Sequence, residues 1–202
     1  AAFAFQGQVC ISLQRAYVHE EVYDEFVKKF TEATNGLKLG DSLDPSVDIS
    51  ALISAGDVQR SLDWIGEAKQ HGAIVAAGGK SEGNILHPTV LLEVDAMLKV
   101  SCQEVFAPIV LINKVSSVEE AIDLVNDSEF GLQAGIYTEN INLALSAAEK
   151  LEVGGVIIND IPTYRVDNMP YGGVKKSGTG REGLKYAIEE MTEMKLVIIN
   201  RN

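Results

Sequence analysis

Apolar residues follow a helical period in the first part of the chain. The residues spaced to share one buried helix face are Val22, Phe26, Val27 and Phe30. They predict a helix over residues 20–35, after a short strand over residues 15–19. A second amphipathic helix is predicted over residues 57–70, before a strand over residues 73–77. The segment between the two helices, residues 39–53, is rich in Gly, Asp, Ser and Pro and predicts a loop.

The second half of the chain alternates apolar runs with amphipathic segments. The predicted strands cover residues 89–94, 109–115, 132–138 and 155–159, and the predicted helices cover residues 118–126, 140–151 and 182–191. This alternation predicts an α/β fold, a mostly parallel sheet with helices on both faces. A long Gly-rich loop over residues 161–180 and a strand-like end over residues 195–200 complete the pattern. Loops of that length in compact domains are usually functional.

The composition predicts a soluble globular domain. The 202 residues are 46% hydrophobic and 23% charged, and Lys+Arg 17 against Asp+Glu 29 gives a net charge of −12. Such an acidic surface argues against nucleic acid as a partner, and no apolar run reaches the roughly 18 residues that would span a membrane. The two cysteines, Cys10 and Cys102, predict free thiols in the cytoplasm. The three histidines have no metal-ligand spacing, and no metal site is predicted.

Cys10 is the first candidate for chemistry. It lies in Gly7–Ser12, where small and polar turn residues precede a short apolar segment that could start a helical turn. A thiol at such a position would face unpaired backbone N–H groups, which favour the thiolate and lower the thiol pKa. Cys10 is therefore a candidate nucleophile. The alternative, a buried structural cysteine, is favoured by the lack of a visible His partner.

Two further stretches of the sequence are candidates for a functional site. Glu104 and Phe106 stand two positions apart in the turn-rich segment Cys102–Pro108, although a solvated carboxylate and a core ring are plain alternatives. The stretch Met169–Gly178 contains more glycine than packing alone would require, which indicates a binding loop. The segment Gly178–Gly183 matches G-x-G-x-x-G, but it follows a loop where the dinucleotide-binding motif follows a strand, which argues against a nucleotide site there.

Together these stretches resemble the aldehyde dehydrogenase superfamily, in particular bacterial enzymes that act on small aldehydes. Gly7–Cys10 is similar to the active-site cysteine motif of the family, Glu104–Pro108 to its E-V-F-G-P signature, and Pro170–Glu182 to its P-F-G-G-x-K-x-S-G-x-G-R-E stretch. The three stretches occur in the family's order. The resemblance implies a catalytic domain over residues 1–191 and a C-terminal oligomerisation strand over residues 192–202.

The resemblance also implies roles for single residues. Cys10 would be the nucleophile, whose thiohemiacetal passes hydride to NAD or NADP and whose thioester is then hydrolysed. The Cys10 backbone N–H would supply half of the oxyanion hole. Glu104 corresponds to the carboxylate that holds the nicotinamide ribose, and Phe106 to the aromatic residue beside the nicotinamide ring.

Two residues are expected on the substrate side. Asn159 closes its strand and, with the following loop, would line the substrate. Arg165 is a candidate contact for an anionic substrate, and the alternative is a surface Arg paired with Asp167. Ala107 departs from the family pattern, which usually has Gly there, and this change matters only if the position needs a positive φ.

Several parts that the family places before the cysteine motif are not in this sequence. They are the N-terminal cofactor domain, the Asn that completes the oxyanion hole and the Glu that activates the deacylating water. We therefore expect part of an NAD(P)+-dependent aldehyde dehydrogenase that does not oxidise aldehydes alone. A non-catalytic interaction or oligomerisation module and a CoA-acylating relative stay open as alternatives. The resemblance further implies a homo-oligomer, a dimer or a tetramer.

Overall fold

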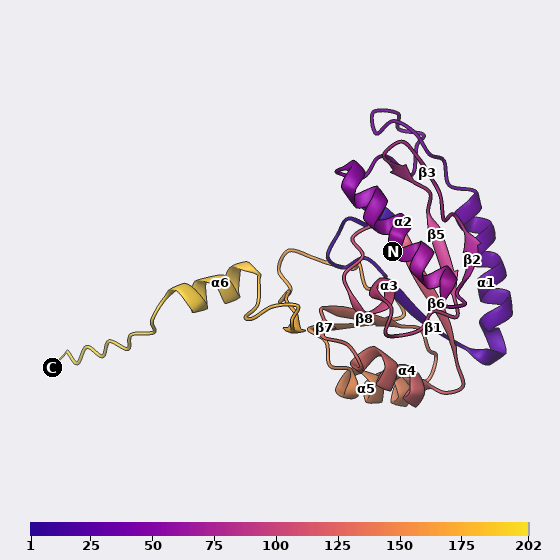
Figure 1. Cartoon of the computed structure of the whole chain (residues 1–202). Helices are drawn as coiled ribbons and strands as arrows, with labels where there is room; N and C mark the ends of the chain where they lie inside the picture. The colour runs from indigo at the N-terminus through magenta and orange to yellow at the C-terminus, as the bar shows by residue number, and fades with distance from the viewer. Residues whose placement is uncertain (202) are drawn as a thin grey trace.

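The computed structural model describes residues 1–201 (Figure 1). After a 3-10 turn over Ala4–Gly7, the helices are α1 (Glu20–Asn35), α2 (Ala55–Gln70), α3 (Lys99–Cys102), α4 (Val118–Asn126), α5 (Ile141–Lys150) and α6 (Leu184–Met191). The strands are β1 (Arg15–His19), β2 (Ile74–Ala77), β3 (Ser81–Glu82), β4 (Ile85–Leu86), β5 (Thr89–Leu92), β6 (Ile109–Val115), β7 (Phe130–Gly131), β8 (Gln133–Ile136), β9 (Gly155–Ile158) and β10 (Val174–Lys175). All the predicted helices are present.

A four-stranded sheet with the order β1-β6-β5-β2 lies at the centre of the molecule. β1, β6 and β5 run parallel, and β2 pairs antiparallel with β5. The predicted α/β fold with a mostly parallel sheet is therefore confirmed. β8 and β9 stand apart from this sheet, because they pair in parallel with each other.

Side chains of β6 alternate between two hydrophobic cores. Ile109 and Leu111 pack with buried residues of α2, whereas Val110 and Ile112 pack on the other side with residues of α1. Successive strand residues point to opposite faces, so a strand that is buried on both faces reads as one apolar run. The two helices thus cover the two faces of the sheet, as the sequence pattern predicts.

Side-chain caps fix where the helices begin. Ser54 Oγ accepts a hydrogen bond from the Asp57 N–H at 3.2 Å, so α2 begins at Ala55, two residues before its predicted start. Ser117 Oγ caps α4 in the same way, at 3.2 Å from the Glu120 nitrogen. Among the helices of residues 1–201, none has the length and apolar character needed to cross a lipid bilayer.

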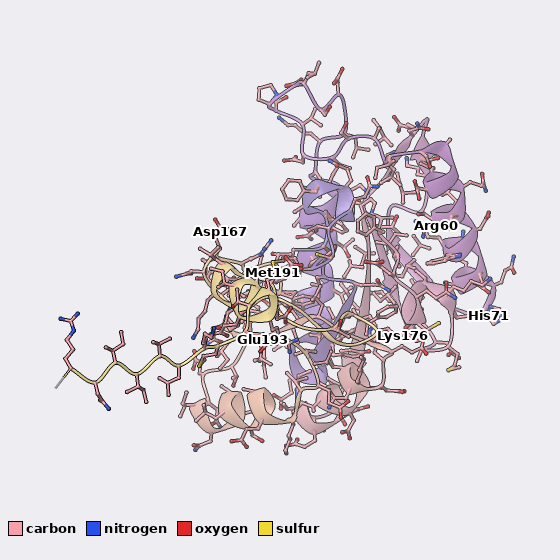
Figure 2. The ribbon with its side chains drawn as sticks, turned by 90° about the vertical axis from the view of Figure 1, so that its left-hand side faces the viewer. Arg60, His71, Asp167, Lys176, Met191 and Glu193 are labelled. Atoms are coloured by element: carbon pink, nitrogen blue, oxygen red, sulfur yellow. The ribbon has the colours of Figure 1, made fainter. Side chains whose placement is uncertain are left out.

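The C-terminal part of the chain extends away from the rest of the molecule (Figures 1 and 2). α6 buries none of its residues, and Met191 at its end is 85% exposed. The predicted strand over residues 195–200 is not formed here. A strand needs the backbone of a neighbour, and no part of residues 1–201 pairs with this segment. Of the expected oligomerisation strand, residue 202 lies outside the described residues.

Candidate active site

Cys10 lies in a tight turn that leads into β1. The Ser12 N–H donates to the Val9 carbonyl oxygen at 3.0 Å, and no helix follows. The expected helical turn is not formed, because the chain continues from this single turn into an extended segment and β1 at Arg15. Cys10 is exposed, so the alternative of a buried structural cysteine is also wrong. Cys10 and Cys102 are free thiols, as predicted.

Gly7 brings the cysteine turn against the second motif. Its φ is +69°, and a Cβ atom at this position would overlap the carbonyl group of Ala107. Only glycine allows both this conformation and such a close approach of two backbones. The glycine of the cysteine motif thus places Cys10 beside the segment that carries Glu104 and Phe106.

Glu104 and Phe106 project from either side of a buried anchor. Val105 is 1% exposed, whereas both neighbours are exposed to solvent. Together with Cys10, Glu104 and Phe106 line one small cleft of about 30 Å³. Phe106 is 37% exposed, so the alternative of a core ring is wrong. Within residues 1–201 the Glu104 carboxylate has no hydrogen-bond or ion-pair partner. This agrees both with the alternative of a solvated carboxylate and with a carboxylate that accepts hydrogen bonds from a ligand.

The strained backbone position of this segment is Phe106. Its φ is +48°, in the left-handed region, which costs a residue with a side chain roughly 1–2 kcal/mol. Ala107 is outside that region, so its replacement of the usual Gly carries no backbone cost. Strain of this kind is commonly retained at functional sites, where the surroundings hold it.

Tyr171 contacts the sulfur of Cys10, and sequence reasoning missed it. Its hydroxyl oxygen lies 2.7 Å from Cys10 Sγ, and the residue is 6% exposed. Burial, together with the hydrogen bond to Cys10, raises the pKa of Tyr171 well above its usual value. The available signal was the departure from P-F-G-G, since Tyr171 adds a hydroxyl where the pattern has Phe.

Arg165 contacts Tyr171, the residue whose hydroxyl lies against Cys10. Its guanidinium carbon is 4.4 Å from the centre of the Tyr171 ring, and Nη2 is 3.4 Å from a Glu182 carboxylate oxygen. The backbone of Tyr171 pairs with that of Glu182, which fixes the arrangement. The expected alternative pairing with Asp167 is wrong, because Glu182 is the partner. Asp167 points to solvent from the same loop (Figure 2).

Asn159 uses its side chain to join two strand ends. Its Oδ1 accepts from the Thr138 N–H at 2.8 Å, and its own N–H donates to the Ile136 carbonyl at 2.7 Å. Asn159 has a φ of +59°, a conformation that Asn tolerates better than most residues. Among the described residues no hydrogen bond joins it to Cys10 or Tyr171.

Close packing accounts for part of the glycine content of the loop. A Cβ atom on Gly172 would lie 2.8 Å from the Gly180 carbonyl oxygen, and one on Gly173 would overlap Ser177. Packing therefore accounts for Gly172 and Gly173, while the binding role of the loop stays a prediction. The segment Gly178–Gly183 lies in a bend ahead of α6 and follows no strand of the central sheet, unlike a dinucleotide-binding turn.

Two exposed groups beside Cys10 have the chemistry that binding of a nicotinamide dinucleotide would need. A free carboxylate can accept hydrogen bonds from ribose hydroxyls, and the exposed Phe106 ring can lie beside the nicotinamide. Within residues 1–201, no group of three or more His, Cys, Asp and Glu side chains comes together to hold a metal ion.

Comparison with known proteins identifies the family. The sequence matches the profile of the aldehyde dehydrogenase family over residues 1–197, so the chain belongs to this family. It is 48% identical over 199 residues to 3-sulfolactaldehyde dehydrogenase of Priestia aryabhattai, covering 98% of this chain and 42% of that protein. It is 46% identical to lactaldehyde dehydrogenase of Methanococcus aeolicus, with the same two shares covered.

Solved structures of aldehyde dehydrogenases have the same fold. Aldehyde dehydrogenase 21 from Physcomitrella patens, in complex with the reaction product succinate, has a TM-score of 0.95 and 41% identity, covering 98% of this chain and 41% of that one. Glyceraldehyde-3-phosphate dehydrogenase GapN from Methanocaldococcus jannaschii, complexed with NADP, has a TM-score of 0.94 and 42% identity, covering 99% and 43%. The chain thus spans about two-fifths of the length of the relatives it matches.

Proposed function

We propose that this chain is the nucleophile-bearing part of an NAD(P)+-dependent aldehyde dehydrogenase that oxidises a small aldehyde to its carboxylate. The observation that carries the proposal is the cleft that Cys10 shares with Glu104 and Phe106. A thiol, a free carboxylate and an exposed ring are the groups that the reaction and its cofactor need. The free cysteines also support a cytoplasmic location for the protein.

In the proposed reaction the Cys10 thiolate adds to the aldehyde carbon. A carbon–sulfur bond forms and the carbonyl oxygen becomes an oxyanion, to which the Cys10 N–H can donate, since it has no partner within residues 1–201. A bound NAD(P)+, which Glu104 and Phe106 would hold, would supply the acceptor for the hydride that this carbon releases as its C=O bond re-forms and the thioester results. Water then cleaves the thioester on Cys10 and releases the carboxylate.

The substrate side is proposed to include Arg165 and Asn159. The names of the relatives support a small, often anionic aldehyde, since they include 3-sulfolactaldehyde and glyceraldehyde-3-phosphate dehydrogenases. Arg165 lies over Tyr171, whose hydroxyl contacts Cys10, so a guanidinium stands near the nucleophile. Glu182 shares this guanidinium at 3.4 Å, and an anionic substrate would compete with it.

The C-terminal segment, residues 192–202, is proposed to pair with another copy of the protein and so form a dimer or a tetramer. It exposes an apolar run whose members are Leu196, Val197, Ile198 and Ile199. An unpaired extended apolar segment is a template for pairing with a second chain. Residues 1–191 would then be the catalytic unit.

An aldehyde panel tests the proposed function. A full-length enzyme that contains this sequence is assayed with lactaldehyde, 3-sulfolactaldehyde, glyceraldehyde 3-phosphate and succinate semialdehyde, each with NAD+ and NADP+. We expect reduced cofactor to form with at least one pair, and Cys10→Ala to abolish it. Cys102→Ala, at the other free exposed thiol, is the matched control and should keep the activity. Turnover that survives Cys10→Ala would contradict the proposal.

Two further arms separate the alternatives. We propose that residues 1–202 alone give no turnover, because the loss of one oxyanion donor costs about 10²–10³ in rate and the loss of a general base about 10²–10⁴. Turnover by this chain that depends on Cys10 would overturn that point. A strict requirement for CoA would assign the CoA-acylating relative, and inactivity of the full-length enzyme with every aldehyde would favour the interaction module.

A further inference from the structure

The side chain of Gln14, the residue directly before β1, is bonded to the segment over residues 100–106. Gln14 Nε2 donates to the Val100 carbonyl at 3.1 Å and to the Gln103 carbonyl at 2.7 Å. Gln14 Oε1 accepts from the Val105 N–H at 3.1 Å. Both ends of this one amide are therefore bonded to the same segment.

Arg60 holds Val105 from the opposite direction. Its Nη1 donates to the Val105 carbonyl at 2.9 Å, so both backbone polar groups of Val105 are bonded to side chains. Arg60 is itself held on α2 (Figure 2). Its guanidinium carbon lies 4.9 Å from the centre of the Trp64 ring, and its Nη2 lies 3.4 Å from Asp57 Oδ1. Val105 is 1% exposed, so losing either partner would leave one of its buried backbone groups without its hydrogen bond.

Val105 lies between Glu104 and Phe106, the two candidate cofactor-binding residues. Glu104 precedes Val105, and Phe106 follows it with a φ of +48°. A left-handed conformation at a residue with a side chain persists only where the surroundings impose it. Gln14 can impose it, because the Gln14 carbonyl accepts from the Leu111 N–H at 2.8 Å and so belongs to the central sheet.

We propose that Gln14 is a positioning residue that sets Glu104 and Phe106 against Cys10, so that nucleotide binding depends on it. The proposal rests on the proposed function, in which these two side chains hold the cofactor. Gln14 lines the same small cleft as Cys10, Glu104 and Phe106, and in this proposal it acts through the backbone on either side of Glu104.

Hydrogen exchange on this chain tests the contact itself. Gln14→Ala should make the Val105 amide exchange about tenfold faster or more, because opening of the segment no longer has to break the bond to Gln14 Oε1. Gln59→Ala is the matched control, since Gln59 bonds only to Asp63 on the exposed side of α2 and should leave exchange at residues 100–106 unchanged. Unchanged exchange in Gln14→Ala overturns the proposal. This arm needs no catalytic activity.

Kinetics of a full-length enzyme test the consequence. Gln14→Ala should raise the KM for NAD(P)+ by about fivefold or more and change the KM for the aldehyde less than about twofold. Gln133→Ala should instead raise the KM for the aldehyde more than the KM for NAD(P)+. The reason is that Gln133 Nε2 donates to the carbonyls of Pro162 and Tyr164, in the loop that carries Arg165. Equal changes of both constants in Gln14→Ala would indicate general loss of structure and overturn the proposal.

A second variant keeps the proposal testable if the Gln14→Ala protein does not fold. Gln14→Glu keeps an acceptor for the Val105 N–H and loses the donor to the Val100 and Gln103 carbonyls. It should shift the KM for NAD(P)+ in the same direction, and an unchanged constant would count against the proposal. If the wild-type enzyme shows no turnover, the proposed function fails, while hydrogen exchange still decides whether Gln14 holds the segment.

Discussion

Gly7 and Tyr171 show how single residues set the surroundings of Cys10. Gly7 lets two backbones approach, and Tyr171 places a hydroxyl 2.7 Å from the sulfur across a sequence separation of 161 residues. The motifs pointed to Cys10, Glu104 and Phe106. Tyr171 in place of the usual Phe was a local signal, but its contact with Cys10 could not be predicted, because the contact depends on tertiary packing between two distant motifs.

Replacement of Gly7 tests the close approach. Gly7→Ala should lower the free energy of unfolding by about 1–3 kcal/mol, because its Cβ would overlap the Ala107 carbonyl and its φ is positive. Urea unfolding measures the change. Gly66→Ala is the control, since Gly66 lies in α2 with open space around it. This change should raise the free energy of unfolding by about 0.5–1 kcal/mol. Equal effects of the two changes would contradict the packing of the motifs.

The raised pKa of Tyr171 predicts a pH dependence of stability. The folded state keeps the phenol protonated above the usual pKa of 10.0, whereas the unfolded state releases the proton there. The stability that Tyr171 contributes is therefore complete below pH 10 and falls as the pH rises further. Tyr171→Phe should show a shallower decline above pH 10, measured by unfolding at a series of pH values. Tyr137→Phe removes the hydroxyl of an exposed tyrosine and is the control. Identical slopes for Tyr171→Phe and wild type would refute the assignment.

Helices and strands could be predicted where a hydrophobic pattern extends over several helical turns or over a whole strand. α1 and β6 have the bounds that the sequence predicts, because one buried stripe and one continuous apolar run specify them. The short elements α3, β3, β4, β7 and β10 were not predicted. They have two to four residues each, too few to show a period, and their backbone bonds depend on the neighbouring segments.

The two-sided burial of β6 predicts a large effect of one core truncation. Leu111→Ala should lower the free energy of unfolding by about 2–5 kcal/mol, because Leu111 is 0% exposed and its removal leaves a cavity. Leu43→Ala makes the same change at a residue that is 89% exposed, and its effect should stay within about 0.5 kcal/mol. Urea unfolding of both variants checks the prediction, and a small loss for Leu111→Ala would contradict the layered core.

At the scale of the whole molecule, the C-terminal segment was the part where the sequence prediction and the fold differ. The apolar run of residues 196–199 has the composition of a strand, but strand pairing needs a partner that residues 1–201 do not provide. Sequence patterns report the preference of a segment and cannot supply its neighbour. The proposed neighbour is a second copy of the protein.

A charge in the apolar run should weaken association between copies. We expect wild type to sediment as a dimer or larger, and Val197→Lys to sediment more slowly, because a buried lysine in the paired segment is unfavourable. Glu193→Lys is the control, as it adds a lysine just outside the run (Figure 2). Sedimentation velocity measures all three proteins. A monomeric wild type, or equal sedimentation of wild type and Val197→Lys, would contradict strand pairing.

The identity of the acylated residue tests the central claim most directly. A full-length enzyme that contains this sequence is mixed with NAD(P)+ and an aldehyde from the panel that it oxidises, quenched in acid within one turnover and mapped by peptide mass spectrometry. We predict the acyl group of the aldehyde on Cys10, because Cys10 shares a cleft with Glu104 and Phe106. An acyl group found on Cys102 or on any other residue, with Cys10 unmodified, would contradict the claim that Cys10 is the nucleophile.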